Sequence, residues 1–206
     1  MPRVRRSPER ASDPLPLLPP SPVTETSAKL SSRRVYSGRI LDVDIDTVRF
    51  PDGSVGELEM VRHSGASAVL PFLSDPGGDD PQVLLVRQYR YAAEDYIYEV
   101  PAGRLDPGES PIDCARRELE EETGCTAARV EPLTTIYTTP GFTDERIHLF
   151  MAVGVTHGEH RREHDEFMEL ETLTLSRALE LVERGQITDA KTVVTLLYAA
   201  GYRAGR

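Results

Sequence analysis

The sequence of 206 residues has no tryptophan and only two cysteines, Cys114 and Cys125. Two cysteines provide neither a disulfide framework nor the repeated spacing of a structural zinc site, and they suit a reducing compartment. No apolar run approaches the roughly 18 residues that a membrane-spanning helix needs. The N-terminus carries arginines but lacks the apolar segment of a secretory signal. We therefore expect a cytoplasmic protein with no membrane span.

Positive charge does not balance the negative charge. The chain has 24 lysines and arginines against 34 aspartates and glutamates, a net charge of −10. This balance argues against a general nucleic-acid-binding protein, and we expect no nucleic-acid partner. It also disfavours an anionic substrate unless bound cations and local arginines reverse the electrostatic field at the site.

Composition divides the chain into three parts. Residues 1–32 are rich in proline, serine and charge, which predicts a disordered tail. In residues 33–63, apolar and polar residues alternate on both sides of a Pro51-Asp52-Gly53 turn, which predicts a small antiparallel sheet. Residues 64–206 read as strands, a helix, strands and two helices, with Ser176 and Thr188 expected to cap the last two. The order predicts an α+β fold with helices packed on a mixed sheet.

The first predicted helix has clear ends and carries an unusual charge cluster. Ser110 is a good N-cap, Pro111 suits the first helical position, and Gly124 is a natural terminator. Within it the sequence places four glutamates in five positions, at Glu118, Glu120, Glu121 and Glu122.

Like charges three or four residues apart repel, so some compensating charge is needed. At about 100° per residue, Glu118, Glu121 and Glu122 share one face, whereas Glu120 points the other way, to solvent. Carboxylates without histidine or cysteine suit hard cations such as Mg²⁺ or Mn²⁺. The alternative interpretation of this pattern is a solvated acidic helix face.

The same segment resembles a known signature. Gly103, Glu109 and the run from Arg117 to Gly124 match the Nudix box, G-x5-E-x7-R-E-U-x-E-E-x-G-U, with Cys125 in place of the last aliphatic residue. The resemblance implies a Nudix hydrolase with an α/β/α sandwich that uses Mg²⁺ or Mn²⁺ to cleave a nucleoside diphosphate derivative. It implies the following metal ligands: Glu118, Glu122, Glu121 and the carbonyl of Ala102. It also implies that Gly103 and a Glu109–Arg117 pair support the loop and helix.

Further segments resemble the ADP-ribose pyrophosphatases. One is Thr139–Glu145, TPGFTDE, which includes Pro140, and another is RQYRY at residues 87–91. The resemblance implies that Arg90 binds substrate phosphate, as its planar guanidinium would suit, and that Glu99 contacts the ribose side or braces the site. Without the resemblance, the first segment is a turn between strands and Arg90 is a surface charge.

The resemblance also suggests roles for the regions that flank this core. It implies a homodimer in which the N-terminal sheet is exchanged and Arg62 stacks on adenine, whereas the plainer alternative is an exposed arginine at a strand end. The general base would come from a late loop at residues 156–168. Glu166 aligns best with that base, Glu163 is the other candidate, and Glu121 is a further catalytic candidate.

Together these features predict hydrolysis of ADP-ribose to AMP and ribose 5-phosphate. Two alternatives remain open at this level. One is a Nudix hydrolase of another nucleotide sugar, a dinucleotide or an oxidised nucleotide. The other is a non-catalytic ADP-ribose-binding regulator, which the intact glutamate set and the acidic net charge disfavour.

Overall fold

A computed structural model describes residues 28–158 and 168–204. The strands and helices are β1 (Ala28–Ser37), β2 (Asp42–Arg49), β3 (Val55–Arg62), β4 (Ala66–Pro71), β5 (Gln82–Arg90), η1 (Tyr91–Ala93), β6 (Asp95–Glu99), β7 (Ala102–Arg104), α1 (Pro111–Thr123), β8 (Cys125–Tyr137), β9 (Arg146–His157), β10 (Met168–Thr174), α2 (Leu175–Glu183) and α3 (Ala190–Ala204). No helix among the described residues is both long and apolar enough to cross a membrane.

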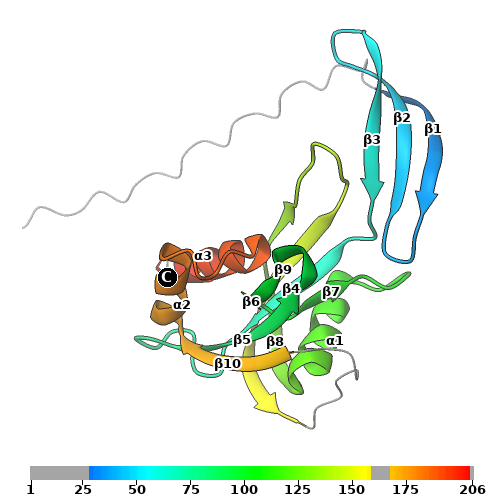
Figure 1. The fold of residues 1–206 in the computed structure, drawn as a ribbon. Helices are drawn as coiled ribbons and strands as arrows, with labels where there is room; N and C mark the ends of the chain where they lie inside the picture. The colour runs from blue at the N-terminus through cyan, green and yellow to red at the C-terminus, as the bar shows by residue number, and fades with distance from the viewer. Residues whose placement is uncertain (1–27, 159–167, 205–206) are drawn as a thin grey trace, which may run out of the picture.

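The N-terminal sheet is a three-stranded antiparallel meander that stands away from the rest of the chain (Figure 1). Its first strand begins at Ala28, so our expectation of a tail up to residue 32 placed the start of the sheet too late. The polar residues at the start of β1 carry no apolar alternation. They are held instead by main-chain pairing with β2, from Ala28 opposite Arg49. The rest of the expected tail lies outside the described residues.

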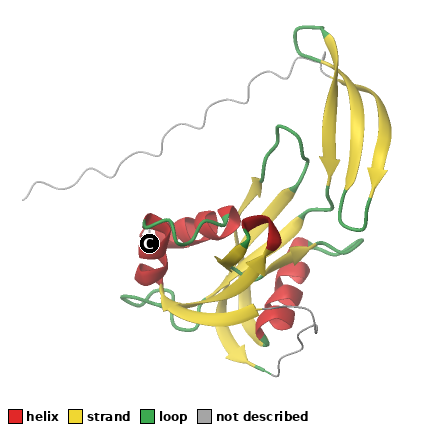
Figure 2. Ribbon diagram, in the orientation of Figure 1, coloured by secondary structure: helices red, strands yellow, loops and turns green. Residues whose placement is uncertain are grey.

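The main domain has a sheet layer with helices on both faces (Figure 2). One sheet has the order β7-β4-β9-β8, with β4 parallel to β9, and the other is antiparallel with the order β10-β5-β6. Every residue of β4 is buried, and its side chains alternate between two cores: Leu70 packs on the side of α2 and α3, and Val69 on the side of α1. The expected α/β/α sandwich is thereby confirmed.

The helix ends show where local sequence signals succeed and fail. Ser110 caps α1 as predicted, because its hydroxyl accepts a hydrogen bond from the Asp113 N–H, and Gly124 ends the helix at φ 68°. The predicted caps of the last two helices were wrong. Thr174, not Ser176, caps α2. The α3 helix begins after Asp189, whose Oδ2 accepts from the Thr192 N–H at 3.0 Å.

Candidate active site

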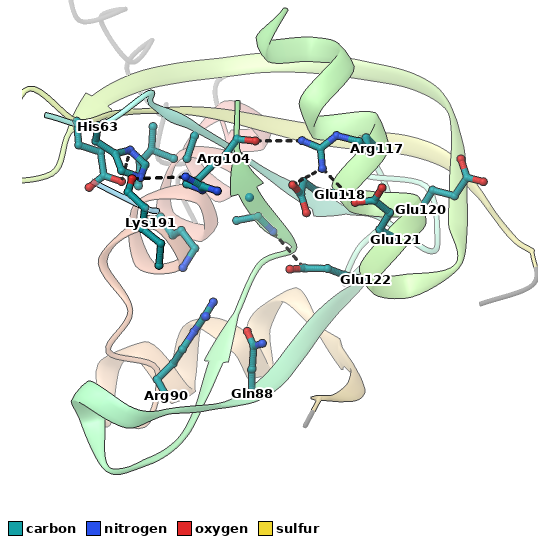
Figure 3. Close-up of a pocket in the computed structure, with 16 residues that line it drawn as sticks. His63, Gln88, Arg90, Arg104, Arg117, Glu118, Glu120, Glu121, Glu122 and Lys191 are labelled. Atoms are coloured by element: carbon teal, nitrogen blue, oxygen red, sulfur yellow. Dashed lines mark hydrogen bonds and ion pairs between the residues drawn. The ribbon is translucent and has the colours of Figure 1, made fainter. Parts of the chain in front are cut away.

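The main domain contains a cavity of about 980 Å³ that lies against α1, β7 and the start of α3. Glutamates of α1 form one side of it, and the side chains of Arg90, Arg104 and Lys191 contribute positive charge to the others (Figure 3). The cavity thus combines carboxylates suited to a cation with basic groups suited to an anion.

The acidic side is built by one turn of α1. Glu118 and Glu122 are buried, at 9% and 6% relative exposure, whereas the Glu121 side chain is half exposed. Glu122 Oε2 accepts a hydrogen bond from the backbone N–H of Ala102 at 3.1 Å, which joins the helix to β7. Glu120 is directed away from the other glutamates, as the helical spacing predicts, although it is only partly exposed and still lies at the rim of the cavity (Figure 3). The backbone of Ala102 therefore lies at the carboxylate cluster.

Arg117 organises these carboxylates. Its Nε donates to Glu109 Oε1 at 2.9 Å, and its Nη1 donates to Glu118 at 2.6 Å and to Glu121 at 3.0 Å. The Arg117 hydrogen bond lowers the pKa of Glu109 to about 2. Burial raises the pKa of Glu118 from its ordinary value, and this effect outweighs the stabilising contact with Arg117. One guanidinium therefore serves three carboxylates and leaves the cluster with excess negative charge.

The surroundings of Glu118 fit a bound cation. A Cβ at Gly103 would lie 1.8 Å from Glu118 Oε1, so a residue larger than glycine would force this carboxylate out of its position. Glu118 and Glu121 turn toward Arg117, and no three acidic, histidine or cysteine side chains among residues 28–158 and 168–204 converge as a finished metal cage. The all-oxygen donor set and its uncompensated charge nevertheless suit a divalent cation that draws the carboxylates together.

A second charged group lies across the cavity. Arg90 donates to both oxygens of Glu99, with the longer bond at 3.0 Å, and Lys191 donates to the same carboxylate. Glu99 is only 2% exposed, so the pair of cations keeps this buried carboxylate ionised and lowers its pKa even though burial acts in the opposite direction. Glu99 thus braces Arg90 at the cavity wall.

Lys191 was not anticipated from the sequence, although one signal was present. A lysine in the first turn of a helix is disfavoured by the positive end of the helix dipole. Its position there, next to Asp189, therefore indicates that its ammonium group also pairs with a carboxylate from another part of the chain. Arg104 was missed as well. It directly follows Gly103 in the box, and the spacing says nothing about where its side chain points.

Arg62 does not line the cavity. It forms ion pairs with Asp44 at 3.2 Å, with Asp144 at 3.1 Å and with Asp46. Asp44 and Asp46 are buried in the N-terminal sheet. Arg62 pairs with Asp46 and shares Asp44 with Arg34, so it helps to neutralise both buried carboxylates. To stack on adenine as predicted, the Arg62 guanidinium would have to contact the base while it keeps these ion pairs, or leave them.

The segment that contains Pro140 joins the N-terminal sheet to the main domain. Pro140 itself is exposed and is not part of the cavity wall. The same turn pairs with the end of β3, since Val61 N–H donates to the Phe142 carbonyl at 2.7 Å and His63 N–H donates to Asp144 Oδ1 at 3.0 Å. His63 and Glu145 lie at the cavity, with His63 Nδ1 3.2 Å from Glu145 Oε1.

The two candidate bases, Glu163 and Glu166, lie outside the described residues. The strands that flank this segment are placed: β9 ends at His157 and β10 begins at Met168, next to β5.

Comparison with known proteins agrees with this architecture. Residues 63–196 match the NUDIX domain family. The chain is 40% identical over 171 residues to the ADP-ribose pyrophosphatase of Bacillus subtilis (strain 168), and the match covers 82% of this chain and 90% of that protein. It is also 39% identical over 171 residues to the methanol dehydrogenase activator of Bacillus methanolicus, and this match again covers 82% of this chain and 90% of that protein.

A solved structure has the same fold. The crystal structure of an ADP compounds hydrolase superposes with a TM-score of 0.75 at 22% identity, covering 90% of this chain and 98% of that one. The matched family spans the box, the carboxylate helix and both sheets of the main domain. The resemblance inferred from the acidic segment is confirmed: the chain belongs to the Nudix family.

Proposed function

We propose that this protein hydrolyses the pyrophosphate bond of ADP-ribose, or of a related ADP-sugar, to AMP and ribose 5-phosphate. The observation that carries this proposal is the 40% identity to an ADP-ribose pyrophosphatase along most of both chains. The cavity supports it, because acidic and basic groups face a common space large enough for a nucleoside diphosphate derivative. The TPGFTDE and RQYRY segments agree with the same substrate class.

Glu118, Glu121, Glu122 and the backbone of Ala102 would hold divalent cations, with Mg²⁺ as our choice and Mn²⁺ as the other hard cation that fits. When bound, the cation neutralises the diphosphate and lowers the barrier to attack by water. Gly103 leaves room for the Glu118 carboxylate, and the Glu109–Arg117 pair sets the orientation of the helix against the preceding loop.

Arg90 would bind substrate phosphate. Its guanidinium is already oriented by the buried Glu99 carboxylate, so little side-chain freedom is lost when phosphate oxygens arrive. Lys191 adds a second cation on the same carboxylate. In this arrangement Glu99 is a brace for the phosphate-binding side chains and does not itself react.

Glu166 or Glu163 would act as the general base that takes a proton from the attacking water. Both belong to the stretch between β9 and β10, and both strands are part of the main domain. Glu121 is the remaining candidate, because its carboxylate is exposed at the same cluster.

We further propose a cytoplasmic homodimer in which the N-terminal sheet reaches a second copy. The exposed apolar residues Leu30, Val35 and Val55 on this sheet support such an assembly. Two buried, unpaired cysteines suit a reducing compartment. Arg62 and Pro140 would then help to form the adenine end of the site through the junction between the sheet and the main domain.

A substrate panel tests the proposed activity. The purified protein is incubated with Mg²⁺ and ADP-ribose, other nucleotide sugars, dinucleotides or oxidised nucleotides, and the products are separated by chromatography. We expect AMP and ribose 5-phosphate from ADP-ribose at the highest kcat/KM. Faster turnover of another diphosphate with none of ADP-ribose would refute the substrate, and ADP-ribose binding without turnover of any compound would indicate a regulator.

A further inference from the structure

The cations at the cavity differ in how fully their charge is compensated. Arg117 contacts three carboxylates, while Arg90 and Lys191 share Glu99. Arg104 is the exception among the described residues, since no carboxylate of residues 28–158 or 168–204 lies within ion-pair distance of its guanidinium. A guanidinium without a counter-ion next to a substrate cavity is a ready anion-binding group.

The side chain of Arg104 is held only weakly. Its Nη1 donates to two backbone carbonyls in the turn between β1 and β2, those of Arg39 at 3.3 Å and Ile40 at 3.4 Å. Both bonds are longer than the usual 2.9–3.0 Å for N–H···O. An anionic ligand would form shorter, charge-assisted bonds in their place.

The backbone of Arg104, in contrast, is firmly positioned. Its carbonyl accepts from Arg117 Nη2 at 3.0 Å, and the residue pairs with Ala66 in the β7–β4 ladder. Arg104 is therefore attached to the carboxylate helix through its main chain while its side chain extends into the cavity. In Figure 3 it approaches the cavity from the side opposite Arg90, with the carboxylates of α1 on a third side.

We propose that Arg104 is a substrate-binding residue that contacts the diphosphate from the β7 side, opposite Arg90. The planar guanidinium of Arg104 matches a pair of phosphate oxygens. Arg90 alone does not balance the negative charge of a diphosphate, because part of the Arg90 charge is already neutralised by Glu99. This assignment rests on the proposed function, because it takes the substrate to be a nucleoside diphosphate derivative. It adds a diphosphate-binding group that the box pattern itself does not define.

Kinetics of three variants test the role of Arg104. Arg104→Met removes the charge but keeps a long side chain. Arg104→Lys keeps the charge but lacks the planar guanidinium that can bind two oxygens at once. Arg129→Met is the control. Arg129 lies on β8 with a side chain 69% exposed and pairs with Glu131, away from the cavity. We expect Arg104→Met to raise the KM for ADP-ribose about tenfold or more, as loss of one charge-assisted bond predicts. Arg104→Lys should lie between Arg104→Met and wild type, and the control should match wild type.

Thermal unfolding distinguishes binding from structural support. If Arg104 only fastens the β1–β2 turn, Arg104→Met lowers Tm while the KM stays within about twofold of wild type, and the assignment is overturned. An unchanged KM with an unchanged Tm overturns it as well. The expected result is a raised KM with a Tm equal to that of wild type and with Lys partly restoring the KM.

Binding of inorganic pyrophosphate separates this inference from the proposed function. Titration calorimetry with Mg²⁺ and pyrophosphate needs no turnover, so it applies even if ADP-ribose proves not to be hydrolysed. We expect wild type and Arg129→Met to bind pyrophosphate and Arg104→Met to bind it about tenfold more weakly or worse. Equal affinity in all variants, or no binding by wild type, would contradict the role of Arg104, whereas failure of ADP-ribose hydrolysis alone would contradict only the substrate.

Discussion

Gly103 lies so close to the Glu118 carboxylate that a larger residue at position 103 would displace it. A Cβ added to Gly103 would lie 1.8 Å from Glu118 Oε1 and 2.1 Å from its Cδ. Glu118 is also buried and bonded to Arg117, so its carboxylate cannot move aside without breaking that pair. The glycine of the box is therefore a space requirement of the carboxylate cluster.

Gly103→Ala is expected to displace Glu118 and lower kcat/KM by at least about tenfold, a barrier increase of about 1.4 kcal/mol. Steady-state kinetics with Mg²⁺ and a melting curve measure the two effects separately. Gly201→Ala is the control, because a Cβ there meets nothing within 4 Å and the residue lies in α3. It should keep activity and stabilise the helix by about 0.5–1 kcal/mol. Full activity of Gly103→Ala would show that Glu118 need not keep this position.

Glu122→Gln is expected to abolish turnover without unfolding the protein. The amide oxygen can still accept the Ala102 N–H, whereas the negative charge offered to a cation is lost. Glu120→Gln, the same change two residues earlier on α1, should keep activity: Glu120 lies at the rim of the cavity, but its carboxylate points away from the cluster. If Glu122→Gln retains activity within about tenfold of wild type, a change below about 1.4 kcal/mol, the assignment of Glu122 as a metal ligand is wrong.

The Glu109–Arg117 pair predicts a loss of stability in acid. The pKa of Glu109 falls from an ordinary value of 4.5 to about 2 in the folded protein, so folding favours the ionised form. Its stabilising contribution is complete above the unfolded pKa of 4.5 and is lost as pH falls toward 2. Urea unfolding of the metal-free protein across this range measures it, and Glu109→Gln should reduce the steepness of the decline. An identical pH dependence in the variant would argue against the pair as a source of acid sensitivity.

Thr192→Val is expected to lower the free energy of unfolding by about 1–3 kcal/mol. The Thr192 hydroxyl accepts from the buried Val100 N–H at 2.9 Å and donates to Asp189 at 2.6 Å, so valine leaves that N–H without a partner. Thr188→Val is the matched control. Thr188 is exposed and α3 is capped by Asp189 instead, so this change should stay within about 0.5 kcal/mol of wild type. A comparable loss in both variants would place the cap at Thr188 after all. Denaturant titration gives both values.

Short-range features of the site could be predicted because they depend on helix geometry. Regular helix geometry gives the angular spacing of Glu118, Glu121 and Glu122 and the outward direction of Glu120. Local capping preference gives the cap at Ser110. Where two cap residues lie close together, local preference did not decide between them. Ser176 is instead bonded to Asp80, a residue far away in the sequence, and Thr174 caps α2.

The carboxylate helix, the family signature and the layered α+β fold could all be predicted from the amino-acid sequence, because they follow from periodicity, spacing and burial of apolar faces. The cations around the cavity, in contrast, are set by tertiary packing. It brought Lys191 and Arg90 onto Glu99, directed Arg104 into the cavity and paired Arg62 with the aspartates of β2. These partners come from separate strands and helices, and the direction of a side chain across a cavity depends on the packing of segments that sequence spacing does not encode.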